Sequence, residues 1–376
     1  MITRIHVQNF KAFENLVVDR MPKFMCLIGV NGSGKTSFIQ LLTFIRALVL
    51  GEVDKWTVGG KQCETKTLSF AGASRRNFEL TVDFSIGNTN QCYTWNLTYN
   101  LYDGPLVREE IKCSDTNKTI LSFSQGELRA LCYDAPFRVS PRGSSLSIPI
   151  DDEILVAIKQ ELSGFAGVGV LDPVAIADAA RVQRGVCEID ENGSGLPAFV
   201  SQLSPEQRTE YTRLITRFYS DFDEVAIKGG KFGWKRIVFT ELKRSLDALH
   251  MSYGTLRYMV MAAFKYTSAR LVYFDEVDNG INQEYLGKVV DLLKSFQDKQ
   301  VVVATHNVQF LNNLDDETLR NGVYFFYKGR GHQTHAKRFF DIPGMSDALE
   351  FDSGGSIVSS TDLVKLGERL FNGGDE

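Results

Sequence analysis

Apolar residues recur along the chain in two rhythms that predict where helices and strands lie. Residues 24–28 form a short continuous apolar run, typical of a strand that is buried on both faces. The run leads into the glycine-rich stretch 29–36, after which apolar residues return at helical spacing between Phe38 and Val49. The sequence therefore predicts a buried strand, a glycine-rich loop and an amphipathic helix, in that order.

Two later stretches alternate strictly between apolar and polar residues. Residues 78–86 and 93–101 both follow this period of two, and the segment 87–90 between them is rich in glycine and asparagine. Such a pattern predicts an antiparallel hairpin with one buried face. Residues 108–113 and 120–123 would extend the hairpin into a meander.

The middle of the chain has a different pattern. From about residue 151 to 245 it becomes mainly helical, including 152–162 and 205–222. It contains no sustained heptads and no internal repeat, so a long coiled-coil arm is excluded.

Two further apolar runs are similar to the first. Residues 271–274 end at Asp275-Glu276, and residues 301–304 end at Thr305-His306. Both runs are rich in β-branched or aromatic residues and are flanked by helical patterns, which predicts parallel strands covered on both faces. The fold class predicted is α/β, with a mixed or parallel core sheet, an antiparallel β subdomain and a helical lobe.

These patterns divide the chain into four parts. We expect an N-terminal lobe with the glycine-rich loop and the meander over residues 1–150, followed by a mainly helical lobe over residues 151–245. The C-terminal part of the core would span residues 246–340, and a peripheral tail with one short helix near 362–370 would span residues 341–376.

The amino-acid composition and the net charge exclude several kinds of protein. Hydrophobic residues make up 43% and charged residues 23% of the 376 positions, as in folded proteins. The formal charge is −4, from 42 Lys and Arg against 46 Asp and Glu, which excludes a globally basic, histone-like binder. The longest apolar stretch, 38–50, is too short and too polar to cross a bilayer, and the first residues lack a signal-peptide pattern. We therefore expect a cytoplasmic protein without a membrane partner, whose six scattered cysteines are reduced and bind no zinc.

Residues 29–36 match the phosphate-binding pattern G-x-x-x-x-G-K-[ST] in full. Glycines let the backbone curl so that successive N–H groups face a phosphate, while Lys35 would neutralise phosphate oxygens and the Thr36 hydroxyl would bind Mg²⁺. The residues that we expect to contact the nucleotide here are Gly29, Asn31, Gly32, Ser33, Gly34, Lys35, Thr36 and Ser37.

Polar residues that close the later strands add candidate chemistry. Asp275 would hold Mg²⁺ and Glu276 would polarise the attacking water, although two solvated carboxylates at a strand end are the plain alternative. His306 would contact a γ-phosphate, or be an ordinary polar terminus. Ser252 and Gly254, at the start of an apolar helix, predict a second anion-binding end or a simple N-cap.

The order of these motifs resembles that of the ABC-type ATPases of the SMC/RecF class. Residues 7–13 are similar to the N-terminal strand and nucleotide-facing loop of that class, a loop that includes Lys11, and residues 187–196 are similar to the middle region of compact bacterial AAA family ATPases. The four motifs that carry the resemblance are 29–36, Ser252-Tyr253-Gly254-Thr255, Asp275-Glu276-Val277-Asp278 and Thr305-His306-Asn307.

The resemblance implies an ABC-type P-loop ATPase with ATP and Mg²⁺ as cofactors. In this class Lys35 and Thr36 would hold the phosphates and the metal, Asp275 would ligate Mg²⁺, Glu276 would be the general base and His306 the switch histidine. Lys35, Glu276 and His306 are thus the expected catalytic residues.

The resemblance also implies that two copies share each active site. Ser252 and Gly254 would contact the γ-phosphate of ATP bound to the second subunit, and Asp278 would lie in the loop that crosses the interface. We therefore expect a homodimer joined through ATP, and a larger homo-oligomer is a further alternative. Ser-Tyr-Gly-Thr differs from the Ser-Gly-Gly-Gln of transporter ATPases, which weakens a transport function.

Three functions remain. Relatives of this build act in bacterial anti-phage systems, so the first is an ATPase whose dimerisation regulates a separate effector protein, a nuclease or a toxin. The second is RecF-like genome maintenance with direct nucleic-acid binding, and the third is a scaffold locked by ATP with little turnover. The basic pairs that would face DNA phosphates are Arg75-Arg76, Lys235-Arg236, Lys243-Arg244 and Lys337-Arg338.

Overall fold

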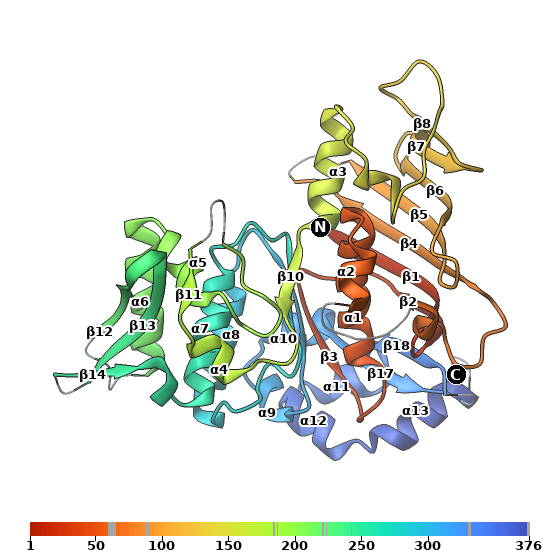
Figure 1. Cartoon of the computed structure of the whole chain (residues 1–376). Helices are drawn as coiled ribbons and strands as arrows, with labels where there is room; N and C mark the ends of the chain where they lie inside the picture. The colour runs from red at the N-terminus through yellow and green to blue at the C-terminus, as the bar shows by residue number, and fades with distance from the viewer. Residues whose placement is uncertain are drawn as a thin grey trace. The chain divides into compact units, whose positions relative to one another are not determined.

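The structure, a computed structural model, has two compact units (Figure 1). The first comprises residues 1–165 and 316–376, and the second comprises residues 166–315. The four-part division drawn from the sequence stays a prediction. The residues that the structure describes are 1–58, 65–87, 91–182, 185, 187–219, 222, 224–241, 243–329 and 332–373.

An eight-stranded antiparallel sheet forms much of the first unit. Alternate residues of β4 and β5 are buried, as the period of two predicts, and the two strands pair from Asn77↔Asn100 to Ser85↔Cys92. The hairpin and the meander are therefore confirmed, while the turn residues 88–90 lie outside the described residues. In spatial order the strands are β2 (Phe13–Val18), β1 (Ile2–Phe10), β4 (Asn77–Ser85), β5 (Cys92–Asn100), β6 (Leu106–Cys113), β7 (Lys118–Ser124), β8 (Glu127–Ala130) and β9 (Phe137–Arg138).

The glycine-rich loop belongs to a second layer of the same unit. It joins β3 (Phe24–Ile28) to α1 (Lys35–Leu50), and β3 pairs in parallel with β17 (Val323–Lys328), which pairs antiparallel with β18 (Thr334–Arg338). The rings of Phe10, Phe44 and Phe78 pack with centroids 5.4–5.6 Å apart and bury one face of α1 against the antiparallel sheet. The predicted order of strand, loop and helix is confirmed.

Short helices complete the first unit. α13 (Leu363–Asn372) confirms the helix expected near 362–370 and packs against β17, with Leu366 buried. The others are α2 (Val53–Val58), η1 (Thr65–Leu68), η2 (Ser145–Ser147), α3 (Glu153–Ser163), α10 (Asp316–Gly322), η6 (Phe339–Asp341), α11 (Met345–Ala348) and α12 (Gly354–Ser360).

The core of the second unit contains the two other buried strands. β15 (Leu271–Phe274) and β16 (Gln300–Ala304) are parallel and every residue in them is buried, which confirms their prediction. β10 (Phe165–Val168) lies on the other side of β15. The helices and turns that accompany them are α4 (Pro173–Ala177), α7 (Tyr253–Phe264), η5 (Gln283–Tyr285), α8 (Leu286–Lys294) and α9 (Val308–Leu311).

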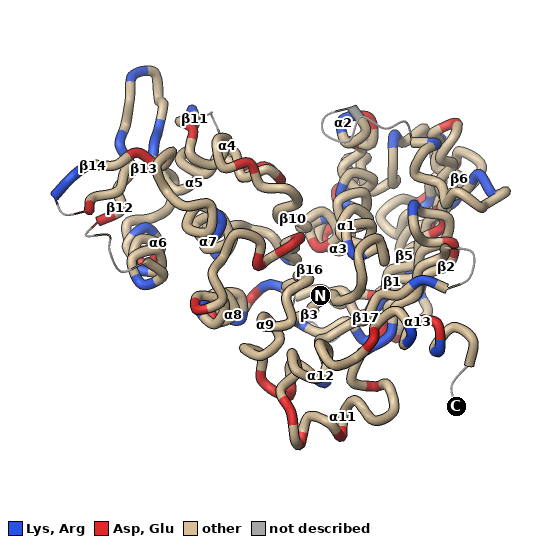
Figure 2. Tube along the Cα trace, turned by 90° about the horizontal axis from the view of Figure 1, so that it is seen from below, with Lys and Arg blue, Asp and Glu red and all other residues tan. Residues whose placement is uncertain are grey.

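A small antiparallel sheet also belongs to the second unit, and Figure 2 shows several basic residues along its strands. Its strands are β11 (Ala180–Arg181), β13 (Trp234–Glu241), β12 (Glu224–Gly229) and β14 (Arg244–Asp247), with η3 (Lys231–Gly233), η4 (Ala248–His250), α5 (Leu196–Gln202) and α6 (Pro205–Phe218) beside them. The prediction of a mainly helical segment is wrong for these strands, because Val225, Ile227, Ile237 and Phe239 alternate toward one apolar face. α6 ends at Phe218, short of the predicted 222; residues 220 and 221 lie outside the described residues.

No helix in the described part of the chain combines the length and apolar character needed to span a membrane. The five cysteines within that part are free thiols, whereas Cys63 falls outside it.

Candidate functional site

The loop between β3 and α1 is shaped by glycines. Gly29, Gly32 and Gly34 all have positive φ angles, of 145°, 75° and 105°. A Cβ atom on Gly29 would lie 2.3 Å from the carbonyl oxygen of Phe326, and one on Gly34 would lie 2.8 Å from Thr334 Oγ1. Because both the backbone conformation and the space exclude a side chain, glycine is required at these two positions.

Lys35 begins α1 and turns its side chain back over this loop. Its Nζ donates hydrogen bonds to the carbonyl oxygens of Gly29, at 2.8 Å, and Val30, at 3.1 Å. The side chain is buried, while Asn31, Gly32 and Thr36 are exposed. No side chain caps α1 and its first turn has no acidic residue, so the helix presents N–H groups and a partial positive charge to an anion.

Lys11 lies on the turn between β1 and β2, close to the same helix. Its Nζ donates to Gln40 Oε1 of α1 at 2.6 Å and lies 5.9 Å from the centre of the Trp56 ring. The buried amide of Asn9 holds this turn, since its Nδ2 donates to the carbonyl oxygens of Arg75 and Asn77, both at 2.9 Å. The structural role of Asn9 was not predicted from the sequence. The one feature that could have indicated it is the presence of an amide side chain within an apolar strand pattern.

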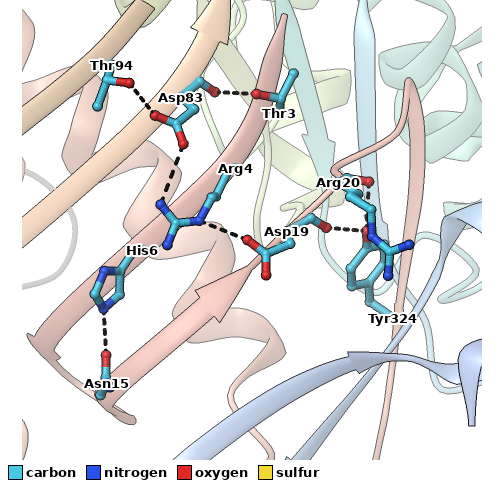
Figure 3. A network of polar contacts seen from close by, with 9 residues as sticks. All are labelled: Thr3, Arg4, His6, Asn15, Asp19, Arg20, Asp83, Thr94 and Tyr324. Carbon is cyan, nitrogen blue, oxygen red and sulfur yellow. Dashed lines mark hydrogen bonds and ion pairs between the residues drawn. The ribbon is translucent and has the colours of Figure 1, made fainter. Parts of the chain in front are cut away.

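A polar network fixes the chain just before β3 (Figure 3). Arg4 of β1 donates to Asp19 Oδ1 at 2.8 Å and lies 3.5 Å from Asp83 of β4. The Tyr324 hydroxyl of β17 is 2.7 Å from the carbonyl oxygen of Asp19 and 2.9 Å from that of Arg20. The network therefore links the antiparallel sheet to β17, the strand that pairs with β3.

In the second unit, the carboxyl ends of β15 and β16 bring a second set of predicted residues together. The strands run in parallel with Phe274 opposite Val303, so Asp275 and Thr305 follow them at the same edge. Thr305 Oγ1 donates to Asp278 Oδ1 at 2.5 Å, and the backbone N–H of Asn307 donates to Thr305 Oγ1 at 2.9 Å. His306, between them, is exposed.

The two acidic residues after β15 have different surroundings. The Asp275 side chain is buried and accepts the backbone N–H of Glu276 at 3.1 Å. The Glu276 side chain is exposed and accepts a hydrogen bond from Asn279 Nδ2 at 3.0 Å. Glu276 has a φ angle of 49°, a conformation that is costly for a residue with a Cβ and that is often found at functional sites.

The start of α7 packs tightly against the loop that contains Asp278. Ser252 is the exposed N-cap, and its Oγ accepts the N–H of Thr255 at 3.2 Å. A Cβ on Gly254 would lie 2.5 Å from the carbonyl oxygen of Gly280, and a Cβ on Gly280 would lie 2.3 Å from the Tyr253 ring. The Ser252 turn and the 278–280 loop therefore behave as one packed element.

A buried arginine, missed by sequence reasoning, joins these parts. Arg257 of α7 is 2% exposed, and its guanidinium donates to the carbonyl oxygens of Asp275 at 2.6 Å, Val277 at 3.3 Å, and Glu276. It also donates to the Tyr253 hydroxyl at 3.0 Å. The one feature of the sequence that could have indicated this role is that Arg257 is a single charged residue in an otherwise apolar helix.

The predicted residues thus gather in two groups, each within its own unit. The first comprises Lys11 and the loop from Gly29 to Ser37; the second comprises Ser252, Gly254, Asp275, Glu276, Asp278 and His306. The Thr36 hydroxyl and the Asp275 carboxylate are hard oxygen donors, which fit Mg²⁺. Mg²⁺ usually takes its remaining ligands from substrate phosphates and water.

Two sequence families match the chain. One, described as an AAA ATPase domain, matches residues 1–228. The other, described as an AAA domain, putative AbiEii toxin, Type IV TA system, matches residues 199–312. A protein of Helicobacter pylori (strain ATCC 700392 / 26695) named ATP/GTP phosphatase is 21% identical over 342 residues, which cover 84% of this chain and 88% of that protein.

Solved structures of SMC heads have a similar fold. The SmcHead bound to the C-winged helix domain of ScpA aligns with a TM-score of 0.53 at 14% identity, over 90% of this chain and 99% of that one. The Smc head domain with an extended coiled coil, bound to the C-terminal domain of ScpA derived from Pyrococcus furiosus, gives 0.53 at 13% identity, over 89% and 95%. These likenesses confirm the predicted α/β P-loop fold.

Proposed function

We propose, on the premise that this chain belongs to the AAA ATPase domain family, that ATP joins two copies of it and that the dimer regulates a separate effector protein. The chain itself is an ATP-binding and ATP-hydrolysing enzyme. The observation that carries the proposal is the exposed Ser252 turn, which packs on the Asp278 loop through Gly254 and Gly280. A rigid, exposed helix N-terminus of this kind suits a phosphate presented by another molecule.

In the proposed site, each residue has one task. Lys35 and the N–H groups of the glycine-rich loop bind the β- and γ-phosphates, and Lys11 is proposed to contact the nucleotide as well. Thr36 and Asp275 would hold Mg²⁺, which neutralises charge on the phosphate oxygens when it is bound. Ser252 and Gly254 of one copy contact the γ-phosphate held by the other.

Glu276 is proposed as the general base. Its exposed carboxylate is oriented by the amide of Asn279 and by the positive φ of its own backbone. A carboxylate held in this way accepts a proton from water as the water attacks the γ-phosphorus. His306, which follows the neighbouring strand, is proposed to contact the γ-phosphate.

The descriptions of the similar proteins support the proposal of a separate effector protein. One matching family carries the description of a putative toxin of a toxin–antitoxin system, which supports a role in anti-phage defence. The Smc heads of similar fold are bound to a second protein, ScpA, which supports a partner for this ATPase. RecF-like genome maintenance is the second candidate, favoured by exposed basic residues of the small sheet.

The test is the mass in solution of wild type and Glu276→Gln, with and without ATP and Mg²⁺, while phosphate release is followed. We expect wild type to turn over and Glu276→Gln to accumulate as an ATP-bound dimer, with phosphate release lower by a factor of about 100 or more. Glu284→Gln, which removes another exposed carboxylate of the same unit, is the matched control and should behave as wild type. Identical mass and turnover in wild type and Glu276→Gln would refute the role of Glu276, and an oligomer independent of nucleotide would favour the scaffold.

A further inference from the structure

The small sheet of the second unit ends in a projecting segment that we call the basic hairpin, residues 228–236 of β12, η3 and β13. Four cations lie in it: Lys228, Lys231, Lys235 and Arg236. No acidic residue occurs between positions 225 and 240. The nearest ion pair among the described residues, Arg236 with Asp247, is long at 3.9 Å and solvent-exposed, so it neutralises little of this charge.

Cross-strand pairing gathers several of these residues on one face. Lys228 lies opposite Arg236, and Arg181 of β11 lies opposite Trp234. Residues directly opposite one another in a sheet point to the same side, as do residues two apart along a strand. Arg181, Lys228, Trp234 and Arg236 therefore share a face, on which three cations surround one aromatic ring.

The aromatic side chains of the basic hairpin are unusually exposed. Phe232 is 81% exposed and Trp234 is 45% exposed. Phe232 also has a φ angle of 58°, and the Arg181 Nε donates to its carbonyl oxygen at 3.1 Å, which holds the tip in this conformation. In Figure 2 the connection between β12 and β13 is coloured as basic at its tip.

We propose that the basic hairpin binds single-stranded nucleic acid. Phe232 and Trp234 stack on successive bases, while Arg181, Lys228, Lys231 and Arg236 contact the phosphates. Exposed rings interleaved with cations are the combination that binds single strands, because every base has a face to stack on and every nucleotide carries a phosphate. An anionic membrane is less well matched, since Phe232 and Trp234 are the two large apolar side chains of residues 228–236 and offer little apolar area to bury in lipid.

The first experiment measures binding of a fluorescein-labelled oligothymidine of about 20 nucleotides, a length that spans one binding platform. Oligouridine and a duplex of the same length are the other probes, and no nucleotide cofactor is added. We expect wild type to bind the single strands more tightly than the duplex. Tighter binding of oligothymidine or of oligouridine shows which of the two strands is preferred and supports the proposal in either case.

Substitutions then separate stacking from charge. Phe232→Ala with Trp234→Ala should weaken binding at least about fivefold, the loss expected for a single stacked base. Lys231→Ala with Arg236→Ala should make the slope of log affinity against log salt shallower by about 1.4, the value for two phosphate contacts to a single strand. Trp234→Phe retains a ring and should bind nearly as wild type, yet lose the quenching of tryptophan fluorescence by the oligonucleotide.

Matched controls lie in the other unit, where Phe351 and Arg129 are exposed and Phe351 reaches 85%. Phe351→Ala and Arg129→Ala should leave binding unchanged, and unchanged thermal unfolding shows that each variant is folded. Equal binding by wild type and the double aromatic variant would overturn the proposal. Binding to phosphatidylserine vesicles without binding to the oligonucleotides would also overturn it and would assign the surface to a membrane.

The proposal rests on no part of the proposed ATPase cycle. Because binding is measured without ATP, an outcome in which Glu276→Gln behaves as wild type would leave it intact. Conversely, loss of binding in the hairpin variants with normal phosphate release would leave the ATPase proposal intact.

Discussion

Arg257 shows how one side chain can fix the geometry of a candidate catalytic loop. A buried charge is costly unless its hydrogen-bonding groups are satisfied. Here the guanidinium is satisfied by three consecutive carbonyl oxygens, those of Asp275, Glu276 and Val277, and by the Tyr253 hydroxyl. Since Glu276 has a positive φ angle, these bonds hold a backbone conformation that the residue would otherwise avoid. Arg257 is therefore a positioning residue for Glu276.

We predict that Arg257→Lys lowers the kcat of ATP hydrolysis by about tenfold or more with little change in KM, because an ammonium cannot reproduce the fork of donors. The glycine-rich loop that is proposed to bind ATP is untouched, so ATP binding should persist. Arg257→Met should also lower the free energy of unfolding by roughly 1–3 kcal/mol, since it leaves buried carbonyl oxygens without a donor. Steady-state phosphate release and thermal unfolding measure the two effects.

The control for this prediction is Arg213→Lys on the exposed face of α6, which should change neither quantity. A rise in KM at constant kcat would contradict the positioning role, because it would mean that Arg257 acts on ATP binding. Wild-type kinetics in Arg257→Lys would contradict it as well.

At the scale of elements, a buried carboxyl group joins the meander to the loop that follows it. Glu109 of β6 is 0% exposed and accepts hydrogen bonds from Trp95 Nε1 at 2.7 Å, from the Ser145 N–H at 2.6 Å, and from the hydroxyls of Ser144 and Ser145. Burial raises the pKa of the Glu109 carboxyl, and the four donors oppose the shift only in part. η2 is thereby attached to the sheet.

We predict that Glu109→Gln lowers the free energy of unfolding by about 1–3 kcal/mol near neutral pH, because an amide NH₂ would face one of the two N–H donors. The pH dependence should change too. A raised pKa contributes stability that is full below the ordinary carboxyl pKa of about 4.3 and is lost as pH rises through the raised value. The stability difference between wild type and Glu109→Gln should therefore shrink as pH rises, as measured by denaturant unfolding across that range.

Glu110→Gln, on the neighbouring position of β6, is the control, because its carboxylate is partly exposed and pairs with Lys112 at 3.2 Å. It should change stability by less than about 0.5 kcal/mol. Parallel pH profiles for wild type and Glu109→Gln would show that Glu109 does not titrate with folding.

Elements whose signal is local could be predicted from the sequence, whereas those defined by tertiary contacts could not. The sequence predicted the strand, loop and helix around Lys35, and also the hairpin 78–101. In both cases the pattern that predicts the element lies within a short segment of the chain. The strands between 224 and 247 were missed, since cations and glycines interrupt their short alternation. Arg257 was missed as a partner of Asp275 because 18 residues separate them and only folding brings them together.

At the scale of the whole molecule, the proposed site has a consequence for mixtures of variants. If ATP lies between two copies, the loop with Lys35 and the turn with Ser252 act on the same ATP from different subunits. A subunit with a defective loop can then still donate a sound Ser252 turn, and the reverse holds. If each copy instead completes its own site, no such exchange takes place.

We predict that Lys35→Ala and Ser252→Arg each abolish phosphate release alone, and that mixing them in equal amounts restores about a quarter of the wild-type rate. Half of the dimers formed at random carry one of each variant, and in those dimers one of the two sites is intact. Phosphate release from the mixture, compared with each variant alone, is the measurement, and Ser359→Arg, an exposed serine of α12, is the control for the added charge. A mixture no more active than its components, from variants shown by mass to form mixed dimers, would contradict a site shared between two copies.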